Sequence, residues 1–552
     1  MILAMGAAHA ASRPCMDWSC AAIEVQADPP AVRFLLQTDP PSTHCSIGRR
    51  TSRDAWGRPQ FTQLVSLEAP TTWEDTDVSL GDRPEYEIRC EFGPGRLDTT
   101  YRRALVDLWW EQPADRGVVA LVVDEDSQAA LAASLDRLEQ DLLDDGWGVL
   151  REVVGPDDPV ASVRERLQAR WEETEHRLSA ALLLGAVPQP FAGHIAPDGH
   201  GEHAGAWPAD TFYADLDGAW TDRQSRGAGS RGRANLPGDG RLDQSVLPGA
   251  LELAVGRVDP RDLPAYAPLS PTDLLAAYLE KNHRYRTGEV RLAPRLWATN
   301  TFRGFVGDQE VMAQVQQHAL RLFGQPATVG PDLVGALLDP EGWQVAMGAG
   351  PGGITNAKDV VRTKDFVVVS ANAAYLGLFG SWFGDAATTD NLLRAALFGP
   401  GTVVATSWFS RPSLRNDRLA AGGTFGDMAV DSAQGGASTH FQLHGDPTLR
   451  LDPMRPPTNA SLDCTPQGPR LVFEPSPDAT LGHRVYRRAE GVPTWVAEER
   501  IGITPLDGPL VDASAEPGHR YVWRVVPVRE KHVPNGVFVE VGTGVRVAGS
   551  CP

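Results

Sequence analysis

The middle of the chain alternates between short, continuously apolar segments and longer segments whose apolar residues recur every three or four positions. Short apolar runs are typical of strands buried on both faces, whereas the wider spacing is typical of amphipathic helices. In the first part of this region the pattern predicts strands at 117–124, 148–154, 178–187 and 251–258 and helices at 131–143, 160–173 and 272–285. Buried strands alternating with helices indicate an α/β fold.

A second series of the same kind follows. It predicts strands at 295–298, 345–347, 366–370 and 403–405 and a helix at 311–322. Strands separated by helices favour a mostly parallel sheet with helices on both faces. The length of the region predicts two α/β subdomains, 105–290 and 291–454, with their sheet units side by side.

The two ends of the chain have a different periodicity. Residues 45–50 and 86–90, and again 484–488 and 521–525, alternate apolar and polar side chains with period two, with turns between them. In each pair a tyrosine, Tyr86 or Tyr521, opens the second strand. This strand, corner and strand pattern resembles fibronectin type III domains, so we expect two all-β sandwich modules, 22–104 and 455–552, flanking the α/β region.

All six cysteines lie in the first or last hundred residues. An even number of cysteines confined to small flanking modules is typical of disulfides formed in an oxidising compartment. Cys45 and Cys90 fall on neighbouring strands C and F of the first sandwich, and Cys464 and Cys551 fall near the two ends of the second. We expect these two pairs to be bonded, although the sequence leaves their connectivity open.

The strand that ends in Gly348-Ala349-Gly350, and the next one, which runs into Asn372-Ala373-Ala374-Tyr375-Leu376-Gly377, together resemble a known active site. Peptidases of the gingipain family, which share the caspase-like fold, carry Gly-His-Gly after one core strand and Ala-Cys-x-x-Gly after the next. The resemblance places Ala349 at the histidine position and Ala374 at the cysteine position. It also implies an oxyanion hole built from the backbone N–H groups of Gly350 and Ala374.

The resemblance extends over about 105–453, where further pieces follow in the order of the family. These pieces are 208–218, 253–258, 401–408 and 443–450. Each is weakly specific alone, and their order is what supports a caspase-like fold.

A thiol peptidase needs a thiolate nucleophile and a nearby imidazole. No cysteine occurs between Cys90 and Cys464, and alanine occupies both family positions, Ala349 and Ala374. The sequence therefore favours a pseudopeptidase that binds a protein, peptide or surface partner. Two alternatives stay open: a cysteine endopeptidase whose histidine and cysteine have been replaced by these alanines, and a non-enzymatic adhesive or structural protein. Neither specificity nor oligomeric state can be inferred.

Two other chemistries fit the sequence poorly. Residues 348–353 match the dinucleotide-binding pattern G-x-G-x-x-G, but no helix opens directly after them and the next predicted strand does not end in an acidic residue. Ser381 lacks the G-x-S-x-G context of a common serine nucleophile. We therefore expect neither a nucleotide site nor a serine hydrolase of that type.

Acidic and histidine residues gather in a loop rich in glycine and proline; they are Asp198, His200, His203, Asp210, Asp215 and Asp217. Because gingipains are stabilised by calcium, the resemblance implies a Ca²⁺ site here. Asp215-x-Asp217-Gly218 supplies alternating oxygen ligands and a tight turn, which a hard cation prefers. A zinc site through His200 and His203 would lack an identified third ligand, and a solvated acidic loop is the structural alternative.

Charge and hydropathy narrow the location and the partners. A formal net charge of -20 argues against nucleic-acid binding, which depends on basic patches. No apolar run approaches the roughly 18 to 20 residues of a membrane helix. Residues 1–10 are apolar and end in Ala8-His9-Ala10, the small-x-small pattern of a signal-peptidase site. With the cysteine pattern, this predicts a secreted, periplasmic or cell-surface protein.

Overall fold

The computed structural model describes residues 22–36, 42–55, 57–68, 71–91, 99–302, 308–409, 414–504 and 508–552. The candidate leader at 1–10 lies outside these ranges. The chain forms two compact units. The first comprises 1–52, 59–110 and 532–538, and the second comprises 53–58, 111–531 and 539–552.

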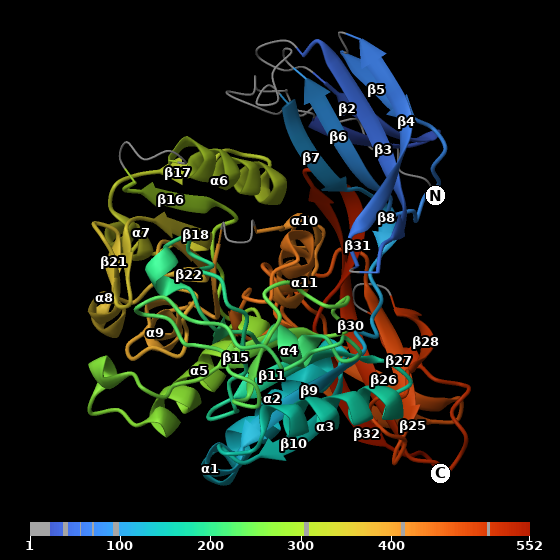
Figure 1. The fold of residues 1–552 in the computed structure, drawn as a ribbon. Helices are drawn as coiled ribbons and strands as arrows, with labels where there is room; N and C mark the ends of the chain where they lie inside the picture. The colour runs from blue at the N-terminus through green and yellow to red at the C-terminus, as the bar shows by residue number, and fades with distance from the viewer. Residues whose placement is uncertain are drawn as a thin grey trace. The chain divides into compact units, whose positions relative to one another are not determined.

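The first unit contains a β-sandwich of a three-stranded and a four-stranded antiparallel sheet (Figure 1). The smaller sheet has the order β1 (Ala22–Ala27), β2 (Pro30–Leu35) and β5 (Thr72–Asp75). The larger has the order β4 (Pro59–Glu68), β3 (His44–Arg53), β6 (Glu85–Glu91) and β7 (Thr99–Leu105). Phe34, Ile47 and Tyr86 are fully buried between them. The all-β prediction for this module is thus supported.

Cys45 and Cys90 are bonded in this sandwich. They lie directly opposite each other on β3 and β6, the adjacent strands on which the sequence analysis placed them. The second predicted disulfide, Cys464–Cys551, is also present. Its loop spans 87 residues and joins the first strand of the C-terminal sandwich to the end of the chain.

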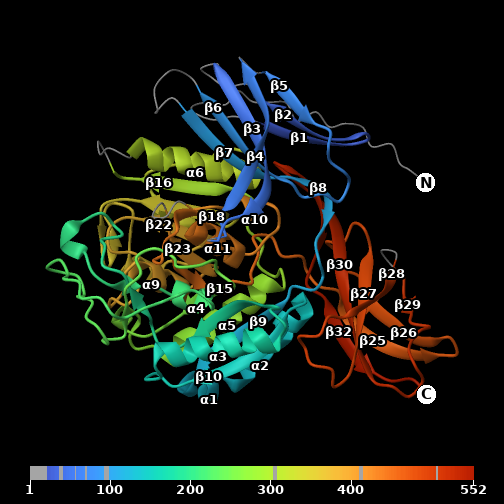
Figure 2. The same cartoon turned by 45° about the vertical axis from the view of Figure 1, so that its right-hand side comes forward.

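That C-terminal sandwich belongs to the second unit (Figure 2). One sheet has the order β25 (Thr458–Thr465), β26 (Gly468–Glu474) and β29 (Leu510–Val511). In the other sheet β28 (Glu499–Thr504) pairs with β27 (His483–Ala489), β27 with β30 (Tyr521–Val533), and β30 with β32 (Val545–Gly549). Leu471, Val485 and Trp523 form its core.

A ten-stranded sheet forms the centre of the second unit (Figures 1 and 2). Its order is β10 (Gly148–Val154), β9 (Val118–Asp124), β11 (Leu178–Leu184), β15 (Ala254–Val258), β24 (Leu443–Gly445), β23 (Ala405–Trp408), β22 (Ala373–Phe379), β18 (Trp343–Ala349), β16 (Leu296–Asn300) and β17 (Thr328–Val329). Neighbours are parallel except β23 and β24, which are antiparallel. The two predicted sheet units are therefore the halves of one sheet, joined at β23 and β24.

Alternation along the central strands explains why both faces of this sheet are covered. On β9, Val119, Leu121 and Val123 pack into one apolar cluster with residues of α2 (Ala132–Asp145), α5 (Pro271–Arg286) and α9 (Leu392–Phe398). Val118, Ala120 and Val122 point the other way and pack with residues of α3 (Val160–Glu173). In the second half, α6 (Asp308–Phe323) and α11 (Phe425–Gly436) pack into a third cluster that includes Met347 of β18. The α/β prediction with helices on both faces is supported.

Helix boundaries follow local chemistry. Before α5, the Ser270 hydroxyl accepts a hydrogen bond from the Asp273 N–H at 3.1 Å, and the Asp273 carboxylate accepts from the Ser270 N–H at 2.9 Å. Pro271 occupies the first helical position, where an N–H would have no acceptor within the helix, so proline costs no hydrogen bond there. Helix α2 ends at Asp145, and Gly146, whose φ of 96° suits glycine, caps its C-terminus.

The predicted strand at 366–370 is wrong. Most of this segment belongs to α8 (Thr363–Val368), and the next strand, β22, begins only at Ala373. Asp365 caps the helix by accepting the Arg362 N–H at 2.8 Å. Phe366 is 1% exposed whereas Val368 is 77% exposed, so only one face of the segment is buried. Strand propensity of the valines is overridden because β22 fills the place between β18 and β23.

A network of buried charges connects the end of α2 to the C-terminal sandwich. Asp145, 2% exposed, accepts from Arg286 Nη1 at 3.1 Å, from Thr543 Oγ1 at 3.3 Å and from Arg450. Arg450 also donates to the Val541 carbonyl at 3.0 Å. Burial alone would raise the pKa of Asp145, but Arg450, Arg116 and Arg286 hold it below its usual value. The carboxylate therefore remains charged inside the protein.

Within the described ranges, no helix combines the length and apolar character that a membrane crossing requires.

Candidate functional site

The positions suggested by the family resemblance lie on adjacent parallel strands, β18 and β22. Ala349 is the last residue of β18, and it stands opposite Phe379, the last residue of β22. Ala374 is the second residue of β22. Five residues at about 3.3 Å each separate Ala374 from Phe379, so Ala349 and Ala374 lie roughly 16 Å apart along the strands. The expectation that Ala374 follows a strand is wrong, and the structure does not bring the two alanines together.

The residues predicted to form the oxyanion hole also lie within the sheet hydrogen bonding. The Gly350 N–H donates to the Phe379 carbonyl at 3.0 Å. Ala374 lies inside the ladder of β22 and accepts the Val404 N–H at 3.0 Å through its carbonyl. The backbone groups predicted to form an oxyanion hole are therefore part of the sheet.

Ser381 is the polar side chain that follows β22, and it lies at the carboxyl edge of this strand. Its Oγ is 2.8 Å from Nε2 of His200, a residue of the long connection between β11 and β15. Two contacts fix the backbone around Ser381. In the first, Trp408 Nε1 donates to the Gly380 carbonyl at 3.0 Å. A Cβ at Gly352 would lie 2.3 Å from the Ser381 carbonyl oxygen, so only glycine permits this approach. Local sequence context gave no sign of this pairing.

Asp198 organises the segment that carries His200. Its Oδ1 accepts the His200 N–H at 3.2 Å, and its Oδ2 lies 2.5 Å from Nδ1 of His203. The His203 ring is 4% exposed and lies 3.8 Å from the Trp382 ring, centroid to centroid. His200 and His203 thus have partners other than a metal, and the metal-ligand cluster found in the described ranges does not include them. The zinc interpretation gains no support.

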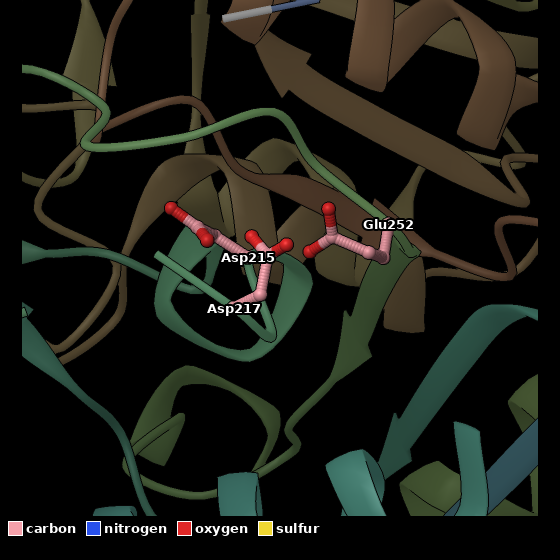
Figure 3. A group of neighbouring side chains, drawn as sticks. All are labelled: Asp215, Asp217 and Glu252. Carbon is pink, nitrogen blue, oxygen red and sulfur yellow. The ribbon is translucent and has the colours of Figure 1, made fainter. Parts of the chain in front are cut away.

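That cluster consists of Asp215, Asp217 and Glu252 (Figure 3), and one carboxylate oxygen from each lies within 4.8 Å of the other two. The two aspartates follow α4 (Thr211–Ala214), and Glu252 precedes β15. The sequence analysis identified the aspartates but not Glu252, which lies 35 positions beyond Asp217 with no spacing signal.

Several hydrogen bonds shape the acidic cluster. The Gly218 N–H donates to Asp215 Oδ1 at 2.6 Å, and the Leu216 N–H donates to Glu252 Oε2 at 2.7 Å. Arg164 donates hydrogen bonds to the carbonyls of Asp215 and Gly218, at 2.8 and 3.0 Å. Within the described part of the chain, the buried Oδ2 of Asp215 accepts no hydrogen bond. An oxygen ligand is therefore available there.

Burial raises the pKa of Asp215 to about 6, against the opposing effects of the Gly218 N–H and Arg164. Burial, with the charges of Asp217 and Asp215, likewise raises the pKa of Glu252 to about 7. Three carboxyl groups with one nearby arginine repel one another when ionised. The donor set of this cluster fits a hard divalent cation, which takes carboxylate oxygens and offsets this repulsion.

Two other sequence pieces meet in a buried ion pair. Asp210 accepts from Nε and Nη2 of Arg257, both at 2.8 Å, and Arg257 is 1% exposed. Arg257 also donates to the carbonyls of Val187 and Pro188. The motifs at 208–218 and 253–258 thus hold the connection after β11 in place. Asp210 has a structural role in the described protein.

Three buried imidazoles, named here the core histidines, make no hydrogen bond through their ring nitrogens within the described residues; they are His318, His440 and His444. Burial lowers the pKa of the first to about 3 and of the other two to about 4. All three are therefore neutral at pH 7.

Comparisons with known proteins add a structural likeness. The Arg-specific cysteine proteinase gingipain R is 13% identical, with 79% of this chain and 100% of that chain covered and a TM-score of 0.43. A Fn3-like protein from Clostridium thermocellum covers 17% of this chain at 16% identity, and an FN3 domain of human collagen XX covers 19% at 20% identity, each with a TM-score of 0.14. No protein-family model and no curated protein matches the chain. With scores this low, functional inference depends on the side chains described above.

Proposed function

We propose that this chain is a secreted caspase-fold protein of gingipain type that binds a protein or peptide without cleaving peptide bonds. The observation that carries the proposal is the absence of a thiol: no cysteine occurs between Cys90 and Cys464, and the cysteines of the described ranges are all disulfide-bonded. A cysteine peptidase cannot act without a thiolate. The two disulfides support a location outside the reducing cytosol.

The alternative of a peptidase disabled at Ala349 and Ala374 is not favoured. A nucleophile and its base must approach within about 3 Å. The two positions are roughly 16 Å apart along paired strands. Histidine at Ala349 and cysteine at Ala374 would therefore not form a catalytic pair.

A peptide ligand at the carboxyl edge of β22 is part of this proposal. Gingipain R is an Arg-specific cysteine proteinase. In the present chain, Trp382 is half-buried at this edge, and aromatic side chains of this kind contribute strongly to binding. The acidic cluster would hold Ca²⁺ through Asp215, Asp217 and Glu252, and the ion would stabilise the connection after α4 by neutralising the carboxylates.

The binding proposal is tested by incubating the purified protein with a mixed peptide library and recovering bound peptides. We expect intact peptides, and a loss of affinity of about tenfold or more in Trp382→Ala. Trp495→Ala, which truncates another half-buried tryptophan in the C-terminal sandwich, is the matched control. Equal loss in both variants, or no captured peptide, would contradict binding at this edge.

A further inference from the structure

We propose that Ser381 and His200 form a nucleophile and general-base pair that accepts an acyl group from activated carboxylic esters. The inference goes beyond peptide binding because it assigns a covalent reaction of a serine hydroxyl to the carboxyl edge of β22. Its first support is the distance of 2.8 Å between Ser381 Oγ and His200 Nε2, which is the separation a base needs to take the hydroxyl proton.

The nucleophile is held by the sheet. Ser381 lies two residues after β22, where Trp408 fixes the preceding carbonyl and Gly352 allows the neighbouring backbone to lie against it. Ser381 is partly exposed, so a ligand can reach it. A rigid backbone on a sheet edge is the support that a catalytic side chain requires.

The base is held independently of the nucleophile. Asp198 binds the His200 N–H, and the His203 N–H donates to the His200 carbonyl at 2.8 Å. His203 is fixed in turn, because its Nδ1 contacts Asp198 and its carbonyl accepts Trp207 Nε1 at 3.0 Å. The turn that presents the imidazole is therefore formed before any substrate arrives. Asp198, His203 and Trp207 are positioning residues.

The residue after the nucleophile is strained. Trp382 has a φ of 70°, in the left-handed region that is unfavourable for a bulky side chain. The stacking of Trp382 on His203 and a turn closed by the Asp385 N–H on the Trp382 carbonyl, at 2.9 Å, hold it there. Strain of this kind accumulates at functional sites. In the described part of the chain, the N–H groups of Ser381 and Trp382 donate to no backbone or side-chain acceptor, which leaves them available to a developing oxyanion.

The reaction follows from these positions. His200 Nε2 takes the proton as Ser381 Oγ bonds to the ester carbonyl carbon, and the carbonyl oxygen becomes an oxyanion. The C–O bond to the alcohol then breaks, and the proton on His200 passes to the departing alkoxide. Water attacks the acyl-serine in the second half, giving its proton to His200, which returns it to Ser381 Oγ as the carboxylic acid leaves.

The substrate class is limited by what the pair lacks. Within the described ranges no acidic side chain contacts Nδ1 of His200, because Asp198 binds the backbone of His200 and the ring of His203. An imidazole without that partner is a weaker base for a poor leaving group such as an amine. We therefore assign activated esters with aromatic leaving groups, which the half-buried Trp382 ring can contact.

The test uses an alkyl fluorophosphonate on the full-length protein, with the labelled residue located by peptide mapping. Attack of Ser381 Oγ on phosphorus forms an O–P bond and releases fluoride. We expect the label on Ser381, none in Ser381→Ala, and a labelling rate lowered about a hundredfold in His200→Ala. Ser245→Ala is the matched control, since Ser245 Oγ lies 3.4 Å from His194 Nδ1 in the same connection; labelling of Ser381 should not change.

A second measurement covers variants that lose their fold. In Ser381→Cys, iodoacetamide should alkylate position 381 faster than in Ser381→Cys/His200→Ala, because the imidazole generates the thiolate. The proposal would be overturned if Ser381 stayed unlabelled in correctly folded protein. It would also be overturned if the labelling rate and the alkylation rate were both unchanged by His200→Ala. Both results would leave the peptide-binding proposal unaffected. Peptide cleavage by the wild-type protein that a thiol reagent abolishes would instead contradict the proposed function and leave the Ser381–His200 proposal unaffected.

Discussion

Asp145→Asn tests the claim that a buried charge network connects the central sheet to the C-terminal sandwich. Asp145 is the acidic partner of Arg450 and one of two for Arg286 among the ion pairs of the described residues. Neutralising it leaves the buried Arg450 guanidinium with the Val541 carbonyl but no carboxylate. Breaking a buried pair from one side costs about 3–5 kcal/mol.

At about 2.1 cal/mol/K of unfolding entropy per residue, a unit of about 440 residues loses about 1 °C in Tm per kcal/mol, so the loss corresponds to a fall in Tm of roughly 3–5 °C. Thermal unfolding followed by circular dichroism at pH 7 measures it. The control is Asp136→Asn on the same helix, because Asp136 pairs with Arg151 at 2.9 Å but its side chain is 66% exposed. An exposed pair contributes less than about 1 kcal/mol. Equal Tm values for the two variants would refute the reasoning.

Two further outcomes concern bound metal and pH. Calcium at a hundredfold excess over its Kd should stabilise the folded protein by about 2.7 kcal/mol, and a chelator should reverse this. The Asp215→Asn/Asp217→Asn variant should lose the stabilisation. A wild-type Tm that does not change on adding calcium would contradict the metal proposal. The core histidines have pKa values below the unfolded value of about 6.5, so the unfolded chain binds more protons between pH 6.5 and about 4. Stability should therefore fall as the pH drops through this window, by on the order of 3 kcal/mol per histidine. Urea titrations of the Asp215→Asn/Glu252→Gln variant measure it without the opposite pH dependence of those two carboxyls, whose pKa values are raised to about 6 and about 7, and a flat profile would contradict it.

The sequence predicted the central strands well where burial is complete. The strand predicted at 117–124 matches β9 to within one residue, since a strand covered on both faces is apolar almost throughout. The strand and helix at 148–154 and 160–173 were placed to the residue. The segment 366–370 failed for the converse reason: its valines favour a strand, but the neighbouring sheet position is taken by β22. Strand propensity alone does not determine which of two neighbouring apolar segments forms a strand of the sheet.

The candidate sites show the same limit. Asp215 and Asp217 were identified because their spacing is local, whereas Glu252 joins them only through the approach of β15 to α4. Ser381 and His200 are 181 positions apart, and the sequence around each lacks a known motif. Only the fold brings such residues together, so no pattern along the chain could have identified the pair. Likewise, the separation of Ala349 from Ala374 depends on where β22 begins.

The central claim is that this protein performs no thiol peptidase chemistry. The most direct measurement is digestion of a mixed peptide library by the purified protein, with and without prior treatment with iodoacetamide, followed by mass spectrometry of the products. The account predicts no cleavage in either sample that differs from a protein-free control. Cleavage that iodoacetamide abolishes would contradict it.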